Sequence, residues 1–327
     1  MAKRFALMAD KTLDCLIIGG GPAGLTAAIY LARFHMNVQV VDAGNSRATW
    51  IPVSHNHAGF PEGIPGADLV EKMAEQARLY GATTVKNRVT RLDPDGDDGG
   101  FVAEWGSGPV HARTVLLATG VFNRRPSMDV ALHDEAMARG LIRYCPICDG
   151  YEVTDKRVGV IGTDEHGIKE AVFLRGFTAD LTLIAPSGPH RLTDEQRIKA
   201  TALDIRLVDG PCYELEIDGD HLAVPTSEGR LLFNSVYPAL GSDVHSDLAR
   251  TIGADIAEDG CVVVDDHQRT TIPGLYAAGD VVIGLDQISH AMGEGGVAAV
   301  TIRNDLTQDK PLVRDHGHVV LVELEDA

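Results

Sequence analysis

The stretch LDCLIIGGGPAGLTAAIYLARFHMNVQVVD, residues 13–42, decides the fold class of this chain. Its apolar run at 13–18 predicts a buried strand, and the run at 38–41 predicts a second one. Between them, the spacing of apolar residues over 25–33 predicts a helix. A strand, a helix and a strand in this order form a βαβ unit, so the sequence predicts a parallel sheet covered by helices.

Gly19, Gly21 and Gly24 lie between the first strand and the helix, in the spacing that binds a dinucleotide. The first glycine permits a tight turn, the second lets a pyrophosphate approach the backbone, and the third lets the helix pack closely. The helix N-terminus adds oriented N–H donors. Asp42 ends the next strand, where its carboxylate can accept a hydrogen bond from a ribose hydroxyl. FAD and NAD could both use this turn.

Outward from this unit, strands and helices continue to alternate. The sequence predicts a helix at 67–80, strands near 85–92, 101–105 and 110–117, and a helix from 287 to about 306. A second strand, glycine turn and helix begin in VGVIGTDEHGIKEAVFLRGF, residues 158–177, and the strand-like run LTLIAP follows at 181–186.

We therefore expect an α/β protein with two Rossmann-like three-layer domains, the second inserted into the first. The first domain spans 1–121 and 243–327, and the inserted domain spans 122–242. Proline and glycine cluster near both predicted boundaries. A chain of 327 residues has the length for two such domains.

Composition argues against several classes of partner. The chain has 29 basic and 47 acidic residues, a net charge of −18, which repels nucleic-acid phosphates and anionic lipid surfaces. No apolar run approaches the ~20 residues that cross a bilayer, and the start MAKRFALMADKTLD has no sustained apolar segment of a secretion signal. We expect a cytoplasmic protein without nucleic-acid or membrane partners.

Five cysteines do not make a disulfide framework in a chain of this size, and only Cys145 and Cys148 form a spaced pair. A C-x-x-C motif places two sulfurs close enough to bridge, and a helix starting there lowers the pKa of the first thiol. No second C-x-x-C or close histidine pair accompanies the motif, so we expect no metal site. Cys15 and Cys261 lie in strand-like runs, where a small buried thiol is expected.

The segment GLYAAGD, residues 274–280, favours FAD over NAD as the ligand of the first glycine turn. A strand that ends in Gly-Asp before a helix places a carboxylate, here Asp280, and a helix N-terminus beside the cofactor's linker. Such a pair suits the ribityl chain and a carbonyl of a flavin.

Four motifs together resemble the low-molecular-weight thioredoxin reductases: GGGPAG at 19–24, ATG at 118–120, CPICDG at 145–150 and AAGD at 277–280. The resemblance runs in the same order over nearly the whole chain. It implies FAD in the first domain, a homodimer, and a redox-active dithiol on the inserted, NAD(P)H-binding-like domain. The residues that it implies around FAD are Gly19, Gly21, Pro22, Ala23, Gly24, Asp42, Asn56, Val89, Thr119, Gly120, Asp280, Gln287 and Ile288.

The same resemblance assigns roles around the dithiol. Cys148 faces the flavin, and Cys145 attacks the disulfide of the substrate. Asp149 serves as the acid-base group for the departing thiol, which a carboxylate can do near neutral pH only when burial raises its pKa. The implied substrate is a thioredoxin-like protein or a small-molecule dithiol or disulfide.

The second glycine turn departs from the family, which makes NADPH a doubtful donor. Asp164 stands where the reductases have the middle glycine, and Glu165 follows it, so two carboxylates would face a pyrophosphate. The basic cluster that grips a 2′-phosphate is replaced after the next strand by Ala185-Pro-Ser-Gly-Pro189, and His190 and Arg191 come late.

This departure resembles branches of the family that work without pyridine nucleotide. They include ferredoxin-linked or deeply branching thioredoxin reductases, and the dithiol oxidases of gliotoxin and holomycin biosynthesis. Asp149, retained as in the reductases, favours a reductase, with a donor other than NADPH for which a ferredoxin-type protein is one candidate. The alternatives are an oxygen-dependent small-molecule dithiol oxidase and a non-catalytic flavin sensor of redox state.

Overall fold

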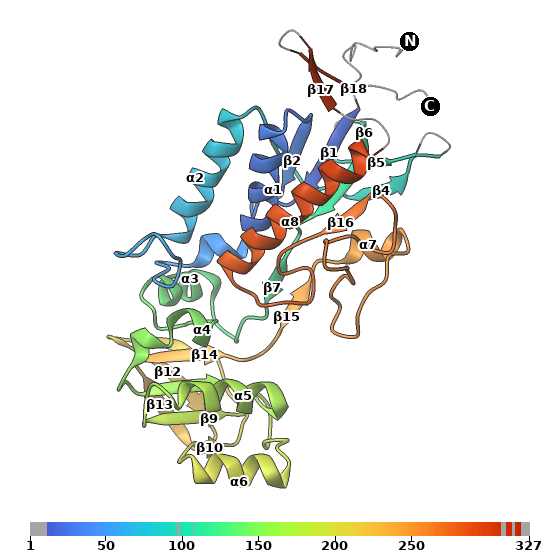
Figure 1. Ribbon diagram of the computed structural model, residues 1–327. Helices are drawn as coiled ribbons and strands as arrows, with labels where there is room; N and C mark the ends of the chain where they lie inside the picture. The colour runs from blue at the N-terminus through green and yellow to red at the C-terminus, as the bar shows by residue number, and fades with distance from the viewer. Residues whose placement is uncertain (1–11, 97–98, 107, 309–311, 316–317, 322–327) are drawn as a thin grey trace. The chain divides into compact units, whose positions relative to one another are not determined.

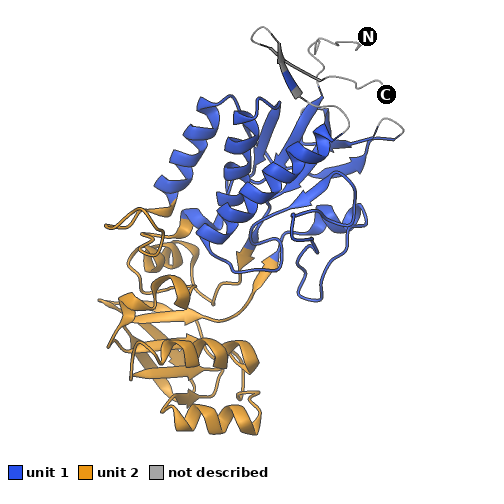
Figure 2. Ribbon diagram, viewed as in Figure 1, with its two compact units in different colours: residues 1–49, 67–121, 244–327 blue, residues 50–66, 122–243 orange. Residues whose placement is uncertain are grey.

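The computed structural model describes residues 12–96, 99–106, 108–308, 312–315 and 318–321. The chain divides into two compact units (Figure 2): unit 1 holds residues 1–49, 67–121 and 244–327, and unit 2 holds residues 50–66 and 122–243. The chain thus leaves unit 1 after residue 121 and returns at residue 244, beside the predicted boundaries. The loop 50–66, expected in the first domain, groups with unit 2.

Unit 1 is built on a seven-stranded sheet (Figure 1). Five of its strands are parallel in the order β3-β2-β1-β6-β16. They are β1 (Leu13–Ile18), β2 (Val38–Asp42), β3 (Thr83–Lys86), β6 (Pro109–Leu117) and β16 (Leu275–Ala277). The first half of β6 also pairs antiparallel with β5 (Phe101–Glu104), which pairs with β4 (Arg91–Pro94).

Two layers cover the parallel strands of unit 1. On one side α1 (Pro22–Arg33) and α8 (Ile288–Thr307) pack against each other, and Figure 1 shows them side by side. The other face carries Leu16, Ile18 and Leu117, which form one apolar core with Phe101 and other side chains of β4 and β5. Successive residues of a strand face opposite sides, so one run of apolar residues fills both layers.

Unit 1 has further elements outside this sheet. They are η1 (Arg47–Trp50), α2 (Gly66–Leu79), α7 (Asp247–Thr251) and the antiparallel pair β17 (Leu312–Asp315) and β18 (His318–Leu321). β7 (Val121–Asn123) and β15 (Ser242–Val244) pair where the chain passes between the units.

Unit 2 repeats the three-layer plan with a smaller sheet. Its parallel strands follow the order β10-β9-β8-β14, that is β10 (Arg206–Val208), β9 (Leu181–Ile184), β8 (Val158–Ile161) and β14 (Ser235–Pro238). The antiparallel strands are β11 (Glu216–Asp218), β12 (His221–Thr226) and β13 (Gly229–Phe233). The helices are α3 (Val130–Ala138), α4 (Pro146–Asp149), η3 (Tyr151–Val153), α5 (Asp164–Leu174) and α6 (Asp194–Ala202).

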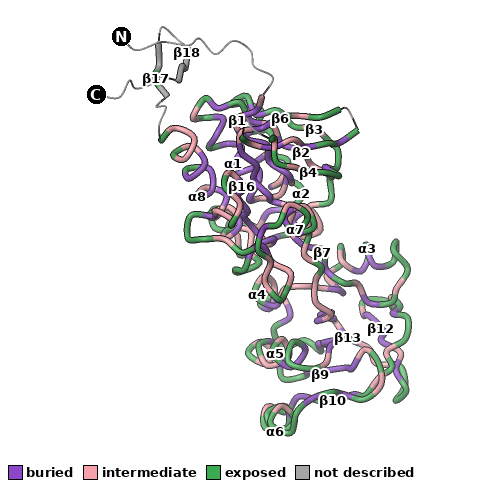
Figure 3. Tube along the Cα trace, turned by 90° about the vertical axis from the view of Figure 1, so that its right-hand side faces the viewer, coloured by how far each residue is buried: buried purple, intermediate pink, exposed green. Residues whose placement is uncertain are grey.

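Alternation along the strands again supplies two cores. Val160 and Leu183 pack with apolar residues of α5 and α6, whereas their neighbours Ile161 and Ile184 pack with Phe233 and the antiparallel strands. Figure 3 shows the central strands of both units buried, with exposed residues on the outer helices such as α6. The predicted α/β class with two Rossmann-like units is confirmed.

One predicted strand differs in detail. The stretch near 85–92 is not continuous, because β3 ends at Lys86 and pairs with β2, while β4 begins at Arg91 and pairs with β5. Apolar spacing alone did not mark this change of partner. No helix within the described residues is long and apolar enough to span a membrane.

Candidate active site

The glycine turn of unit 1 has the geometry that a dinucleotide requires. Gly19 has φ +114°, and a Cβ on it would lie 2.1 Å from the Ala118 carbonyl oxygen. A Cβ on Gly24 would lie 2.1 Å from the Gly19 carbonyl oxygen, so α1 packs against the turn only with glycine there. A Cβ on Gly21 would lie 3.2 Å from the Ser46 Oγ, and without a side chain here a pyrophosphate can approach the backbone.

Donors and an acceptor flank the turn. Helix α1 begins at Pro22 with Gly21 as its N-cap, and no side chain caps it, so the first N–H groups, including that of Ala23, are available to phosphate oxygens. The Asp42 Oδ1 accepts a hydrogen bond from the Gly20 N–H at 3.2 Å. A carboxylate bound through one oxygen can still accept from a ribose hydroxyl through the other.

Residues expected to contact FAD through backbone lie at the end of β6 and in the core. The Thr119 hydroxyl donates to the His245 carbonyl oxygen at 2.6 Å, and the His245 N–H donates to the Gly120 carbonyl oxygen at 3.0 Å. Gly120 has φ +64° and open space where a side chain would be. Val89 is buried in the core of unit 1.

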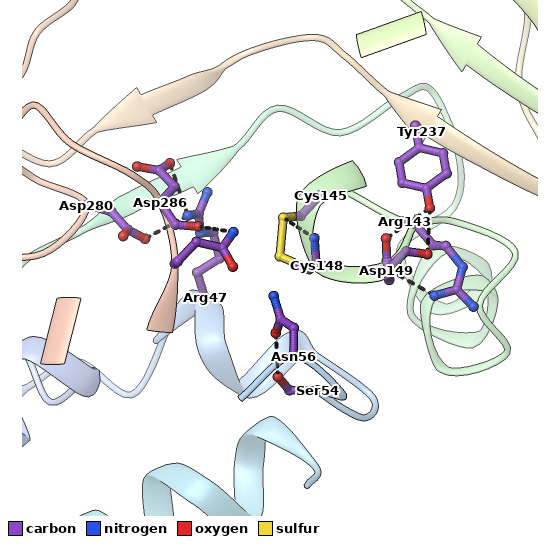
Figure 4. The surroundings of a disulfide bond; sticks show 11 residues. Arg47, Ser54, Asn56, Arg143, Cys145, Cys148, Asp149, Tyr237, Asp280 and Asp286 are labelled. Atoms are coloured by element: carbon purple, nitrogen blue, oxygen red, sulfur yellow. Dashed lines mark hydrogen bonds and ion pairs between the residues drawn. A yellow bond between two sulfur atoms is a disulfide. The ribbon is translucent and has the colours of Figure 1, made fainter. Parts of the chain in front are cut away.

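A charged cluster surrounds Asp280 (Figure 4). Arg47 from η1 lies 2.7 Å from the Asp280 carboxylate and 3.0 Å from that of Asp286. Burial raises the pKa of Asp280, and the positive charge of Arg47 opposes that rise. Glu294 accepts a hydrogen bond from the Gly279 N–H at 2.7 Å, which ties α8 to the Gly-Asp turn.

The start of α8 completes the predicted FAD residues of unit 1. Gln287 is its N-cap, with extended backbone and no capping bond from its side chain, and Ile288 is its first residue. Asn56 belongs instead to the loop 50–66 of unit 2, where its Oδ1 accepts from the Ser54 hydroxyl at 3.1 Å. The glycine turn, Asp42, Asp280 and the start of α8 fit the phosphates, ribose and ribityl chain of FAD.

The predicted dithiol is a disulfide in unit 2. Cys145 and Cys148 are joined with an S–S distance of 2.11 Å, and both side chains are half-buried. Cys145 is the N-cap of α4, and the Cys148 N–H points at the Cys145 Sγ from 3.1 Å. Once the bond is reduced, this N–H stabilises a thiolate on Cys145, which favours Cys145 as the attacking sulfur.

Asp149 directly follows Cys148, and its half-buried side chain is held from two sides (Figure 4). Arg143 donates through Nη1 to Asp149 Oδ2 at 3.0 Å, and the Tyr237 hydroxyl donates to Asp149 Oδ1 at 2.9 Å. Burial raises the pKa of Asp149, while Arg143 and Tyr237 lower it by stabilising the carboxylate. A buried acid with a raised pKa retains its proton to higher pH, as a proton donor to a thiolate requires.

The other cysteines do not share this environment. Burial raises the pKa of Cys15 to about 12 and that of Cys212 to about 11, and it also raises that of Cys261 to about 11. Thiols with such pKa values are weak nucleophiles at neutral pH. Within the described residues, no group of three histidine, cysteine or acidic side chains could hold a metal ion.

Sequence reasoning missed three residues of these clusters: Arg47, Arg143 and Tyr237. Arg47 and Asp280 are 233 positions apart in the sequence, and Tyr237 and Asp149 are 88 apart. No local pattern marks such pairs. Arg143 could have been identified from the sequence, because a basic residue only two positions before Cys145 is close to the dithiol.

The second glycine turn, in unit 2, keeps only part of the dinucleotide geometry. A Cβ on Gly167 would lie 2.7 Å from the Gly162 backbone, so these two glycines still pack the helix against the turn. Asp164 takes the middle position with φ +57°, a left-handed backbone that aspartate adopts more readily than most residues. We expected both carboxylates to repel a pyrophosphate. Because the Glu165 carboxylate pairs with Lys169 at 2.6 Å, the repulsion would come mainly from Asp164.

The loop after β9 also differs from a phosphate-binding loop. His190 is buried, its Nε2 lies 3.1 Å from the Leu183 carbonyl oxygen, and burial lowers its pKa, so it is a neutral core residue. The Arg191 N–H donates to the Thr163 hydroxyl at 3.1 Å, which fastens this loop to the glycine turn.

A model of the pyridine nucleotide-disulphide oxidoreductase family matches residues 13–295. The chain belongs to this family. A thioredoxin reductase of Aquifex aeolicus is 30% identical over 328 residues, which cover 96% of this chain and 99% of its own. These findings confirm a flavin-dependent disulfide oxidoreductase of the thioredoxin-reductase type, with FAD as its cofactor.

Solved structures agree with this assignment. A thioredoxin reductase of Streptococcus pyogenes has a TM-score of 0.83 at 26% identity and covers 92% of this chain and 100% of its own. The crystal structure of HlmI has a TM-score of 0.82 at 26% identity and covers 93% of this chain and 95% of its own.

The Arg143–Asp149 pair gives a prediction for the pH dependence of this oxidoreductase. Because Arg143 lowers the pKa of Asp149, Arg143→Met should raise that pKa further. The protonated acid then persists to higher pH, so the fall in activity on the alkaline side of the pH profile should occur at a higher pH. The measurement is the rate, across pH, at which dithionite-reduced enzyme reduces an aromatic disulfide in stopped flow.

Arg157→Met is the matched control, because Arg157 is exposed and pairs with Asp180 at 2.9 Å, away from Asp149. Its profile should follow that of the unaltered protein. An Arg143→Met profile equal to the control would show that Arg143 does not act on the proton donor.

Proposed function

We propose that this enzyme reduces the disulfide of a thioredoxin-like protein with electrons from a ferredoxin-type donor instead of NADPH. Unit 1 binds FAD, and unit 2 carries the dithiol that transfers the electrons onward. The observation that carries the proposal is the Cys145–Cys148 disulfide at the start of α4, followed directly by the half-buried Asp149. This arrangement supplies both a sulfur nucleophile and a proton donor.

Bound FAD, once the donor had reduced it, would supply the two electrons that open the Cys145–Cys148 disulfide. The reduced Cys145 thiolate attacks one sulfur of the substrate disulfide, forms a mixed disulfide and expels the other sulfur as a thiolate. Asp149 protonates that thiolate. Cys148 then loses its proton and attacks the Cys145 Sγ, which restores the Cys145–Cys148 bond and expels the second substrate sulfur as a thiolate. This thiolate takes up the proton that Cys148 lost.

Two features of unit 2 support a donor other than NADPH. The middle position of the second turn holds Asp164, whereas the corresponding position of unit 1 is Gly21, which has no side chain. A carboxylate there repels a pyrophosphate and fills its place. His190 is buried and cannot serve as a surface cation for a 2′-phosphate.

Exposed apolar side chains beside the dithiol support a protein substrate. Ile147 and Tyr151 are 51% and 81% exposed, although both are apolar over most of their surface. Such residues next to a reactive centre suit contact with a macromolecular partner. We place the enzyme in the cytoplasm, because a reaction cycle that regenerates free thiols needs a reducing compartment. We also expect the enzyme to form the homodimer that the family resemblance implies.

The test is an anaerobic titration of the oxidised, FAD-loaded protein, followed by flavin absorbance. Reduced ferredoxin should bleach the flavin and drive thioredoxin reduction, whereas stoichiometric NADPH or NADH should not. Bleaching by stoichiometric NADPH would contradict the proposed donor. Hydrogen peroxide release on adding a small dithiol in air, without thioredoxin reduction, would instead identify a dithiol oxidase.

A further inference from the structure

Unit 2 contains a hollow of about 210 Å³ that the reaction above does not use. It lies between the residues that follow α3, Arg143 just before the disulfide, and Ser235, the first residue of β14. The polar residues that line it are Arg139, Arg143, Lys156, Asp220, Asn234 and Ser235. A water molecule occupies about 30 Å³ of liquid, so the hollow has room for a small ion and some of its hydration.

The charged residues that line the hollow are mostly basic, whereas the chain as a whole has a net charge of −18. The lining holds three cations, Arg139, Arg143 and Lys156, and one carboxylate, that of Asp220. Outside the lining, Arg139 pairs with Glu135 at 3.0 Å and Arg143 pairs with Asp149 at 3.0 Å. Asp220 is fully exposed and lies 3.5 Å from Arg139, so it compensates little of this charge. The positive charge at the hollow that no described carboxylate balances is therefore that of Lys156, and this charge attracts anions.

Several donors around the hollow are incompletely used. Lys156 is exposed, and no described carboxylate lies within ion-pair distance of its ammonium group. The Nε of Arg143 is buried and has no hydrogen-bond partner within the described part of the chain. Asn234 accepts the Arg157 N–H through its amide oxygen at 3.0 Å, which leaves its amide NH₂ as the donor.

Arg143 connects the hollow to the proton donor of the active site. Its Nη1 donates to Asp149 Oδ2 at 3.0 Å. Its Nη2 lies against Gly140 on the wall of the hollow, since a Cβ on Gly140 would be 2.5 Å from that atom. An anion bound in the hollow would thus compete with Asp149 for one guanidinium group.

We propose that this hollow binds a small phosphate-type oxyanion, and that the bound anion regulates Asp149 by drawing Arg143 toward the hollow. The regulatory part rests on the proposed function, whereas binding does not. The free ion and the phosphate group of a small metabolite share this chemistry, and both offer several acceptor oxygens to Arg139, Arg143 and Lys156.

The direction of the effect follows from charge. An anion beside Arg143 weakens the stabilisation that Arg143 gives to the Asp149 carboxylate, and it adds a second negative charge nearby. Both changes favour the protonated acid. The bound anion should therefore move the alkaline limb of the pH profile upward, in the same direction as Arg143→Met.

The binding test is calorimetry of the full, FAD-loaded chain with inorganic phosphate and, separately, with glycerol 3-phosphate, at constant ionic strength. We expect one site per chain, and binding about tenfold weaker in Lys156→Ala and in Arg139→Ala. Lys169→Ala is the control, because Lys169 is an exposed cation of α5 paired with Glu165 and outside the hollow. The relative affinities for the two ligands tell the free ion from a phosphorylated metabolite.

Absence of binding by the unaltered protein, or an equal loss in Lys169→Ala, would overturn the site. Phosphate should also shift the pH profile of the unaltered protein and not that of Lys156→Ala. Saturable binding with an unmoved profile would overturn the regulatory part. Calorimetry needs no turnover, so a protein that binds phosphate but reduces no disulfide would refute the proposed function and leave the site standing.

Discussion

We expect Cys148→Ser to lower the rate of disulfide reduction by at least about 10³-fold, the scale of losing a covalent nucleophile. A serine hydroxyl cannot form the bond to the Cys145 Sγ, so the two-electron disulfide disappears and the mixed disulfide cannot be resolved. The glycine turn, Asp42 and Asp280 lie in unit 1, so the flavin should stay bound. The measurements are the flavin spectrum and the rate of thioredoxin reduction by reduced ferredoxin.

Cys212→Ser is the matched control for this change. Cys212 is also in unit 2, but it is not disulfide-bonded, and burial raises its pKa to about 11. Its replacement should alter the rate by no more than about twofold. If Cys148→Ser kept the activity of the control, electrons would not pass through the Cys145–Cys148 pair.

The second large effect is expected at the phosphate-facing glycine. Gly21→Ala should weaken FAD binding about tenfold to a hundredfold, since an added methyl group at a packed contact costs ~1–3 kcal/mol. The fold should tolerate the change, because Gly21 has φ −82° and its Cβ would meet only the Ser46 Oγ at 3.2 Å. Flavin content after purification and reconstitution of the apoprotein measure the affinity, and circular dichroism measures the melting temperature.

Gly293→Ala serves as its control. Gly293 is an exposed position within α8, and nothing lies within 4 Å of a Cβ there. Alanine also has a higher helix propensity than glycine, so this variant should retain full flavin and melt no lower than the unaltered protein. Equal flavin content in the two variants would show that no phosphate approaches Gly21.

The elements of this protein could be predicted from local sequence because each carries its own signal. Buried parallel strands such as β1 are continuous apolar runs, and α8 was predicted within one residue of its observed start at Ile288. The weaker prediction, one strand near 85–92, failed where β3 and β4 choose different partners. Strand pairing depends on residues far away in the sequence, which a local window does not contain.

The sequence by itself determined the glycine turn, the C-x-x-C pair and the presence of Asp164 in place of a glycine in the second turn. Each of these depends on residues within a few positions of one another. Only the tertiary structure decided what surrounds them. Arg143 and Tyr237 meet at Asp149, and Arg47 meets Asp280 across 233 positions, because the folded strands and loops bring these charges together. Burial, which raises the pKa of Asp149, is likewise a property of the packed unit and of no single segment.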